Sequence, residues 1–153
     1  MKHSLESVLK GKIVIVGVGN VLRGDDAFGP ALIERLSGQV NVPCIDAGSS
    51  PENYTGKIIR EKPDTILIVD ALHHGGEPGA YMILAGEEIV KSGFTTHDLS
   101  PKLFIEYLES ETRAQIYLLG VEPETLSLGE EMSGAVRQTL FDLENKLKEL
   151  LHA

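Results

Sequence analysis

The chain has 153 residues, of which 42% are apolar and 24% are charged, the mixture expected of a single folded domain. Its 14 Lys and Arg against 23 Asp and Glu give a formal charge of -9. We therefore expect neither a nucleic acid nor a membrane as a partner, because both attract basic rather than acidic proteins.

The single cysteine, Cys44, cannot form an internal disulfide, which favours a reducing compartment. No apolar stretch approaches the about 20 residues of a bilayer span, and no apolar region of a signal peptide follows the N-terminal residues. We expect a cytoplasmic protein. Cys44 lies within a predicted strand and has no adjacent base, so we interpret it as a core residue rather than a nucleophile.

Short apolar runs alternate with helical periodicities along the chain. Continuous runs of branched apolar residues are typical of strands buried on both faces of a parallel sheet, whereas apolar residues three or four positions apart indicate a helix. These patterns predict strands at 13–16, 40–45, 66–69, 81–84 and 116–119, and helices at 28–36, 51–60, 103–108 and 132–150.

The strand at 81–84 follows the one at 66–69 after a glycine-rich turn, which leaves no room for a helical crossover. We therefore expect it to run antiparallel, at an edge of the sheet. The predicted fold class is α/β, in three layers, with helices on both faces of a twisted, mostly parallel sheet of five strands. We expect one domain over residues 1–153, with its core at about 12–151.

Candidate functional residues follow the ends of the predicted strands, because an open α/β sheet binds its ligands at the carboxyl ends of its strands. Carboxylates and histidines are frequent there. The segments concerned are 17–26, 46–48, 70–74, 95–97 and 120–124.

The glycine-rich segment Gly17–Gly24 does not fit a nucleotide-binding loop. Leu22 stands where a dinucleotide-binding fingerprint has its third glycine, and Asp25 and Asp26 stand where a phosphate-binding loop has lysine and then serine or threonine. Two carboxylates at that place would repel a phosphate. We therefore predict no nucleotide cofactor and no cofactor-binding residues.

Asp26, Asp70 and His97 come from three of these segments and together match a metal site of two carboxylates and one imidazole with open positions. Asp70 follows four large apolar residues, so its carboxylate is expected to be at least half buried and to need a hydrogen bond, a charge partner or a metal. Each residue also has a structural alternative. Asp26 or its neighbour Asp25 suits a helix N-terminus, Asp70 could cap the next element, and His97 could lie at a helix start.

His73 and His74 lie close behind Asp70 and could supply a further ligand or a general base. Histidines in a glycine-rich turn are more often solvated, and we favour that interpretation here. Neither a G-x-S-x-G elbow nor an H-E-x-x-H helix motif is present, which disfavours serine hydrolases and zincins.

Taken together, these segments resemble the hydrogenase maturation proteases, endopeptidases that remove the C-terminal extension from the large-subunit precursor of nickel-iron hydrogenases. The resemblance rests on Gly17–Gly29, Asp46–Gly48, Ile68–Ala71, Thr95–Leu99 and Gly120–Glu124, which occur in the family's order along nearly the whole chain. The form Thr95-Thr96-His97 is most similar to the branch that serves membrane-bound, hydrogen-evolving hydrogenases.

The resemblance implies a phosphorylase/hydrolase-like sheet of five strands and three metal-contacting residues, which map to Asp26, Asp70 and His97. Asp26 and Asp70 would be the catalytic residues of an aspartate-dependent peptidase, with a water attacking the scissile carbonyl. The nickel would be supplied by the large-subunit precursor, the expected partner, so no tightly bound metal of the protease's own is expected. Ala27 departs from a frequent glycine, and Glu122 from a position that commonly carries an amide.

Two other functional classes remain open at this point. A nickel-sensing or chaperone module that binds the precursor without cutting it would use the same residues. A peptidyl-tRNA hydrolase also has a first strand that leads into a Gly-x-Gly-Asn loop, but an RNA-handling enzyme of this size should be basic, whereas this chain carries -9.

Overall fold

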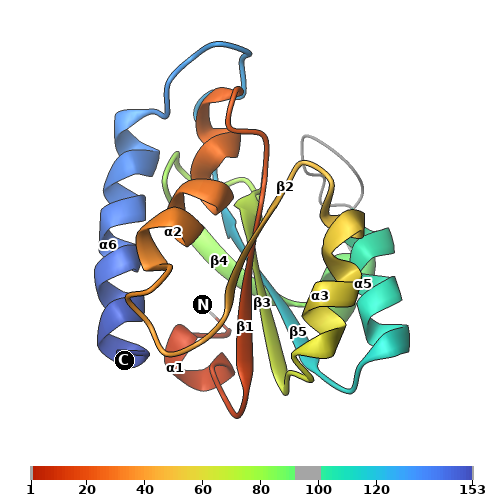
Figure 1. The fold of residues 1–153 in the computed structure, drawn as a ribbon. Helices are drawn as coiled ribbons and strands as arrows, with labels where there is room; N and C mark the ends of the chain where they lie inside the picture. Colours follow the sequence, from red (N-terminus) through yellow and green to blue (C-terminus); the bar gives the residue numbers. More distant parts are fainter. Residues whose placement is uncertain (1, 92–100, 153) are drawn as a thin grey trace.

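The computed structural model describes residues 2–91 and 101–152. Within these ranges a sheet of five strands lies between two layers of helices (Figure 1). The strands are β1 (Ile13–Val18), β2 (Cys44–Gly48), β3 (Thr65–Ala71), β4 (Tyr81–Ala85) and β5 (Gln115–Val121), in the order β2-β1-β3-β5-β4. All neighbours are parallel except β4, which pairs antiparallel with β5 at one edge. The α/β fold class and the antiparallel edge strand are confirmed.

Helices cover both faces of the sheet. Helices α1 (Leu5–Val8), α2 (Phe28–Leu36) and α6 (Gly134–Leu150) pack on one face. Helices α3 (Thr55–Arg60), α4 (Gly86–Lys91) and α5 (Pro101–Glu111) pack on the other. Two 3-10 turns, η1 (Gly24–Ala27) and η2 (Pro51–Tyr54), precede α2 and α3. No helix within residues 2–91 and 101–152 is long and apolar enough to cross a membrane.

The central strands β1 and β3 are buried at every residue because each face of the sheet meets its own helical layer. Successive residues of β1 alternate between the two cores: Ile13 and Ile15 face α2 and α6, while Val14 and Val16 face α3 and α5. Strand β3 behaves in the same way, and all seven of its residues are buried. Continuous rather than alternating apolar runs follow from this double burial.

Strand β2 begins four residues later than the sequence predicts. The N–H of Ile15 in β1 donates to the carbonyl of Pro43 at 3.0 Å, and strand pairing starts at Cys44. Residues before Pro43 turn toward the C-terminal segment instead, where Val40 forms an isolated bridge with His152. Proline has no N–H for a sheet ladder, which accounts for a strand that starts only after it.

The buried face of α5 agrees with the prediction in part. The apolar stripe that predicts this helix consists of Leu103, Phe104, Tyr107 and Leu108, but Leu103 and Tyr107 are exposed. Phe104 and Leu108 pack against the sheet as predicted, and Ile105 joins them there. Two overlapping stripes share the helical spacing in this segment, and only tertiary packing decides which of them is buried.

Candidate active site

Strands β1 and β3 lie side by side, and their carboxyl ends lie together at one end of the sheet. They pair in parallel register from Ile13 opposite Thr65 to Gly17 opposite Val69. Asp70 follows Val69 within β3, and Asp26 lies in η1, which follows β1 and packs against β3. Strand β2, which follows β1 in sequence, pairs with the side of β1 that faces away from β3. The strand order therefore reverses between β1 and β3, and open α/β sheets bind ligands at such a switch point.

Asp26 is 1% exposed and is held by the glycine-rich loop after β1. The backbone N–H of Asn20 donates to its Oδ2 at 2.8 Å. Gly19 has φ +148, and a Cβ at this position would overlap the Asp26 carbonyl oxygen. Glycine therefore allows the loop to close directly over the aspartate.

Gly29 brings the start of α2 equally close to the sheet. A Cβ on Gly29 would overlap the carbonyl oxygens of Val18 and Val69, which belong to the ends of β1 and β3. The turn that carries Asp26 is thus seated between the two strand ends. Any side chain at position 29 would prevent this close packing.

Asp70 is 5% exposed, in agreement with the expectation that it would be at least half buried. Its Oδ1 accepts the backbone N–H of Ala71 at 2.8 Å. This bond to the next residue of β3 fixes the orientation of the Asp70 carboxylate. Asp26, in the turn after β1, and Asp70, near the end of β3, therefore lie at the same end of the sheet, as predicted.

Asp25 has a different role from the helix cap considered for it. Its buried carboxylate accepts the backbone N–H groups of Glu124, Thr125 and Ser133 at 2.8, 3.1 and 2.7 Å. The Ser133 hydroxyl donates to the same carboxylate at 2.8 Å. Asp25 therefore ties the loop between β5 and α6 to the turn that carries Asp26. Asp25 is therefore structural, whereas the neighbouring Asp26 lies at the adjoining carboxyl ends of β1 and β3.

His97 lies outside the described residues, so the predicted set of Asp26, Asp70 and His97 stays a prediction. Within residues 2–91 and 101–152, no group of three or more His, Cys, Asp or Glu side chains is placed to hold a metal ion. The two described members of the set supply only oxygen ligands. Any metal bound by them would need further ligands from other parts of the chain or from a substrate.

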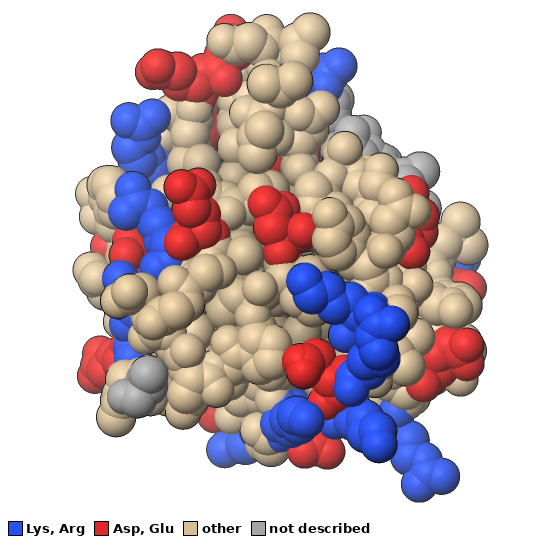
Figure 2. Space-filling view, viewed as in Figure 1, with Lys and Arg blue, Asp and Glu red and all other residues tan. Residues whose placement is uncertain are grey.

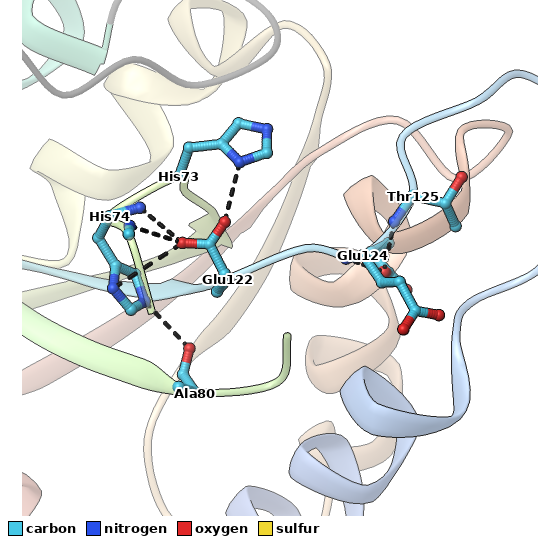
Figure 3. A network of polar contacts seen from close by, with 8 residues as sticks. His73, His74, Ala80, Glu122, Glu124 and Thr125 are labelled. Carbon is cyan, nitrogen blue, oxygen red and sulfur yellow. Dashed lines mark hydrogen bonds and ion pairs between the residues drawn. The ribbon is translucent and has the colours of Figure 1, made fainter. Parts of the chain in front are cut away.

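Glu122 forms a second polar cluster at the same edge, which the sequence did not reveal (Figure 3). It follows β5 directly, is 7% exposed and binds the turn 73–75 that leaves β3. The interpretation of both histidines in this turn as solvated is wrong for His74, because its side chain is buried and its Nε2 lies 3.0 Å from the Ala80 carbonyl oxygen. The sequence did contain a signal for this cluster, because Glu122 follows β5 and the two histidines follow the neighbouring strand β3.

The pKa of Glu122 is lowered, whereas the pKa of Cys44 is raised. Burial alone would raise the pKa of Glu122, but hydrogen bonds from His74, His73 and Gly75 outweigh it and hold the pKa below the ordinary value of 4.5. Burial raises the pKa of the Cys44 thiol to about 11. Glu122 is thus an ionised carboxylate at neutral pH, and Cys44 is a protonated thiol unsuited to nucleophilic attack.

Residues 30–149 match the family model described as hydrogenase maturation protease. The chain belongs to the hydrogenase maturation protease family. The hydrogenase 3 maturation protease of Escherichia coli K12 is 30% identical over 138 residues, which cover 88% of each chain. This match decides against the peptidyl-tRNA hydrolase alternative.

Solved structures of maturation proteases share the fold. The crystal structure of the [NiFe] hydrogenase maturation protease HycI from Thermococcus kodakarensis KOD1 superposes with a TM-score of 0.87 at 37% identity, covering 96% of this chain and 97% of that one. The solution structure of the endopeptidase HycI from Escherichia coli gives 0.81 at 29% identity, covering 91% and 90%. The chain is a hydrogenase maturation endopeptidase, a hydrolase, and Asp26 and Asp70 lie at the carboxyl ends of its parallel strands β1 and β3.

Proposed function

We propose that this maturation protease removes the C-terminal extension of a nickel-iron hydrogenase large-subunit precursor after nickel has been inserted. The observation that carries the proposal is the pair of buried aspartates, Asp26 and Asp70, at the adjoining ends of two parallel strands. A carboxylate pair in a crevice is suited to acid–base chemistry on a water and a peptide bond. The Thr95-Thr96-His97 motif further favours a hydrogen-evolving hydrogenase as the source of the precursor.

A carboxylate of this pair carries the proton during cleavage in this proposal. It accepts a proton from a water as the water oxygen attacks the scissile carbonyl carbon. The proton is then returned to the amide nitrogen as the carbon–nitrogen bond breaks, so that a new carboxyl terminus and a free amine are released. Hydrogen bonds from Asn20 and Ala71 fix the orientation of the two carboxylates before the substrate arrives.

Nickel belongs to the substrate in this proposal. Asp26, Asp70 and His97 offer three oxygen or nitrogen ligands, whereas a closed structural site usually has four protein ligands. A precursor that already holds nickel completes the coordination and presents its scissile bond at the same time. Cleavage would then wait until the metal has been loaded correctly, and the protease needs no tightly bound metal of its own.

The end of the molecule that carries the aspartates is suited to a polypeptide partner. Val21 and Leu22 in the loop after β1, and Leu128 in the loop after β5, are exposed aliphatic residues. The two loops are joined by the Gly129 N–H, which donates to the Leu22 carbonyl at 2.7 Å. Figure 2 shows this end, at the top of the view, as largely uncharged surface with acidic and basic groups around it, while a larger cluster of Lys and Arg lies over α3.

The decisive experiment offers the metal-free protease two precursors in the presence of a chelator, one loaded with nickel and one without it. We expect the mass of the loaded precursor to fall by that of its C-terminal peptide, with no change in the other. Efficient cutting of the nickel-free precursor would show an aspartate peptidase that does not require nickel. Stable binding without a change in mass would instead identify a non-cleaving, nickel-sensing module.

A further inference from the structure

Glu122 binds three donors that all belong to the turn after β3. Its Oε1 accepts the backbone N–H groups of His74 and Gly75 at 2.8 and 2.9 Å. Its Oε2 lies 2.9 Å from Nδ1 of His73 (Figure 3). One carboxylate therefore holds both the backbone of this turn and the ring of its first histidine.

The contact with His73 is the one that requires a carboxylate. A glutamine at position 122 could accept the two backbone N–H groups with its amide oxygen and would avoid the cost of burying a charge. An ionised carboxylate has no proton to donate, so the proton between Oε2 and Nδ1 belongs to the imidazole. Neutral His73 is thereby fixed as the Nδ1–H form, and its Nε2 carries an unshared electron pair.

The two adjacent histidines use their outer nitrogens differently. His74 is buried, and its Nε2 is bonded within the protein to the Ala80 carbonyl. The side chain of His73 is 56% exposed, and in Figure 3 its ring extends from Glu122 with the far nitrogen turned away from the carboxylate. Glu122 thus presents an imidazole acceptor to solvent three residues beyond Asp70.

We infer that His73 is a substrate-contacting residue of this protease, whose Nε2 accepts a hydrogen bond from a backbone N–H of the precursor, and that Glu122 is its positioning residue. The inference rests on the proposed function and deepens it. The Leu72 N–H donates to the Val121 carbonyl at 2.9 Å, so the turn stays joined to the end of β5 at the edge that carries Asp70. An extended polypeptide that enters there has unpaired backbone N–H groups, which need acceptors.

Three variants test this assignment. In His73→Asn the side-chain amide takes the place of Nδ1–H and keeps the bond to Glu122, but the outward Nε2 is lost. His73→Ala removes both. In Glu122→Gln the amide nitrogen faces His73 as a donor, which favours the Nε2–H form of the ring and removes the outward acceptor.

The matched control is the His3–Glu88 pair. Glu88 Oε1 lies 2.8 Å from His3 Nε2 and accepts the Ala85 N–H at 2.9 Å, so it also combines an imidazole with a backbone donor. Ala85 pairs with Tyr117 near the start of β5, whereas Glu122 follows the other end of that strand. Glu88→Gln should therefore leave processing unchanged.

We expect all three variants at 73 and 122 to raise KM for the nickel-loaded precursor by about three- to ten-fold, the loss of one hydrogen bond, with kcat within about two-fold. Nitrogen-15 NMR of labelled histidine at about pH 8 should show the Nδ1–H form of His73 in the wild type and the Nε2–H form in Glu122→Gln. A merely structural role predicts that His73→Asn, which keeps the Glu122 bond, behaves as the wild type.

An unchanged KM in His73→Asn and His73→Ala would overturn the inference, as would an Nε2–H ring in the wild type. These results are distinct from failure of the proposed function, in which the wild type itself would not cut the loaded precursor. Because His73→Asn leaves Glu122 and its backbone contacts in place, it remains decisive if Glu122→Gln does not fold.

Discussion

Asp25 and Ser133 are joined by both the backbone N–H and the hydroxyl of the serine, at 2.7 and 2.8 Å, although 108 residues separate them. Ser133 is also the N-cap of α6, where its hydroxyl accepts the Val136 N–H at 3.4 Å. The start of the last helix is thereby anchored to the turn that carries Asp26. The stability of that turn therefore depends on a contact with a segment distant in sequence.

Removing this anchor should destabilise the protein. Asp25→Ala leaves the N–H groups of Glu124, Thr125 and Ser133 without the buried carboxylate that accepts them, and we expect the free energy of unfolding to fall by about 1–3 kcal/mol. Urea denaturation measures the change. Asp142→Ala on the exposed face of α6 is the control and should stay within about 0.5 kcal/mol. Equal stability of the two variants would contradict the anchoring role.

Much of the fold could be predicted because burial on both faces leaves continuous apolar runs in β1, β3 and β5. The short turn before β4 left only an antiparallel pairing. The shared location of Asp26 and Asp70 could be predicted because the carboxyl ends of neighbouring parallel strands lie together. Local pattern and topology were enough for these features.

Contacts between distant loops could not be predicted in the same way. The partners of Asp25 lie in the loop before α6, and the partner of His73 follows β5. Their positions depend on how the loops pack, and no periodicity in the sequence records it. The same holds for α5, where the spacing allowed either Leu103 or Ile105 to face the core.

Gly24 should be more sensitive to substitution than a residue at the far end of α2. It has φ +52, and a Cβ there would lie 2.7 Å from the Thr125 carbonyl oxygen. Gly24→Ala should therefore lower stability by about 1–2 kcal/mol and impair processing, because the strained turn carries Asp26. Ser37→Ala is the comparison. If precursor cleavage assays gave equal rates for the two variants, the loop would have no special part in activity.

Glu122 should make the protein's stability depend on pH in acid. Its pKa is lowered from 4.5 in the folded state, so its contribution is fully present above that value and is lost as pH falls through the folded pKa. The difference in unfolding free energy between the wild type and Glu122→Gln should therefore shrink as the pH is reduced from about 6 to about 3. Urea titrations at several pH values measure it. A difference that grows toward acid would have the wrong sign.

The exposed aliphatic residues of the loop that precedes Asp26 should affect substrate binding rather than folding. The double change Val21→Ser and Leu22→Ser removes apolar surface from the loop after β1, and we expect KM for the precursor to rise about ten-fold or more with little change in thermal stability. Leu150→Ser, an exposed site at the end of α6, is the control. Unchanged KM in the double variant would remove this loop from the substrate-binding surface.

The two crevice aspartates should be essential for cleavage but not for folding. Asn has the same shape as Asp, so Asp26→Asn and Asp70→Asn can keep the bonds from Asn20 and Ala71 while losing the charge needed to accept a proton or to contact nickel. We expect each change to lower the rate of precursor processing by at least about a hundred-fold. His97→Ala should have a similar effect if His97 completes the set. Mass spectrometry of the precursor measures cleavage, and circular dichroism reports whether each variant is folded. An unfolded Asp70→Asn would make Asp70 a mainly structural residue, whereas a folded and active one would remove it from the reaction.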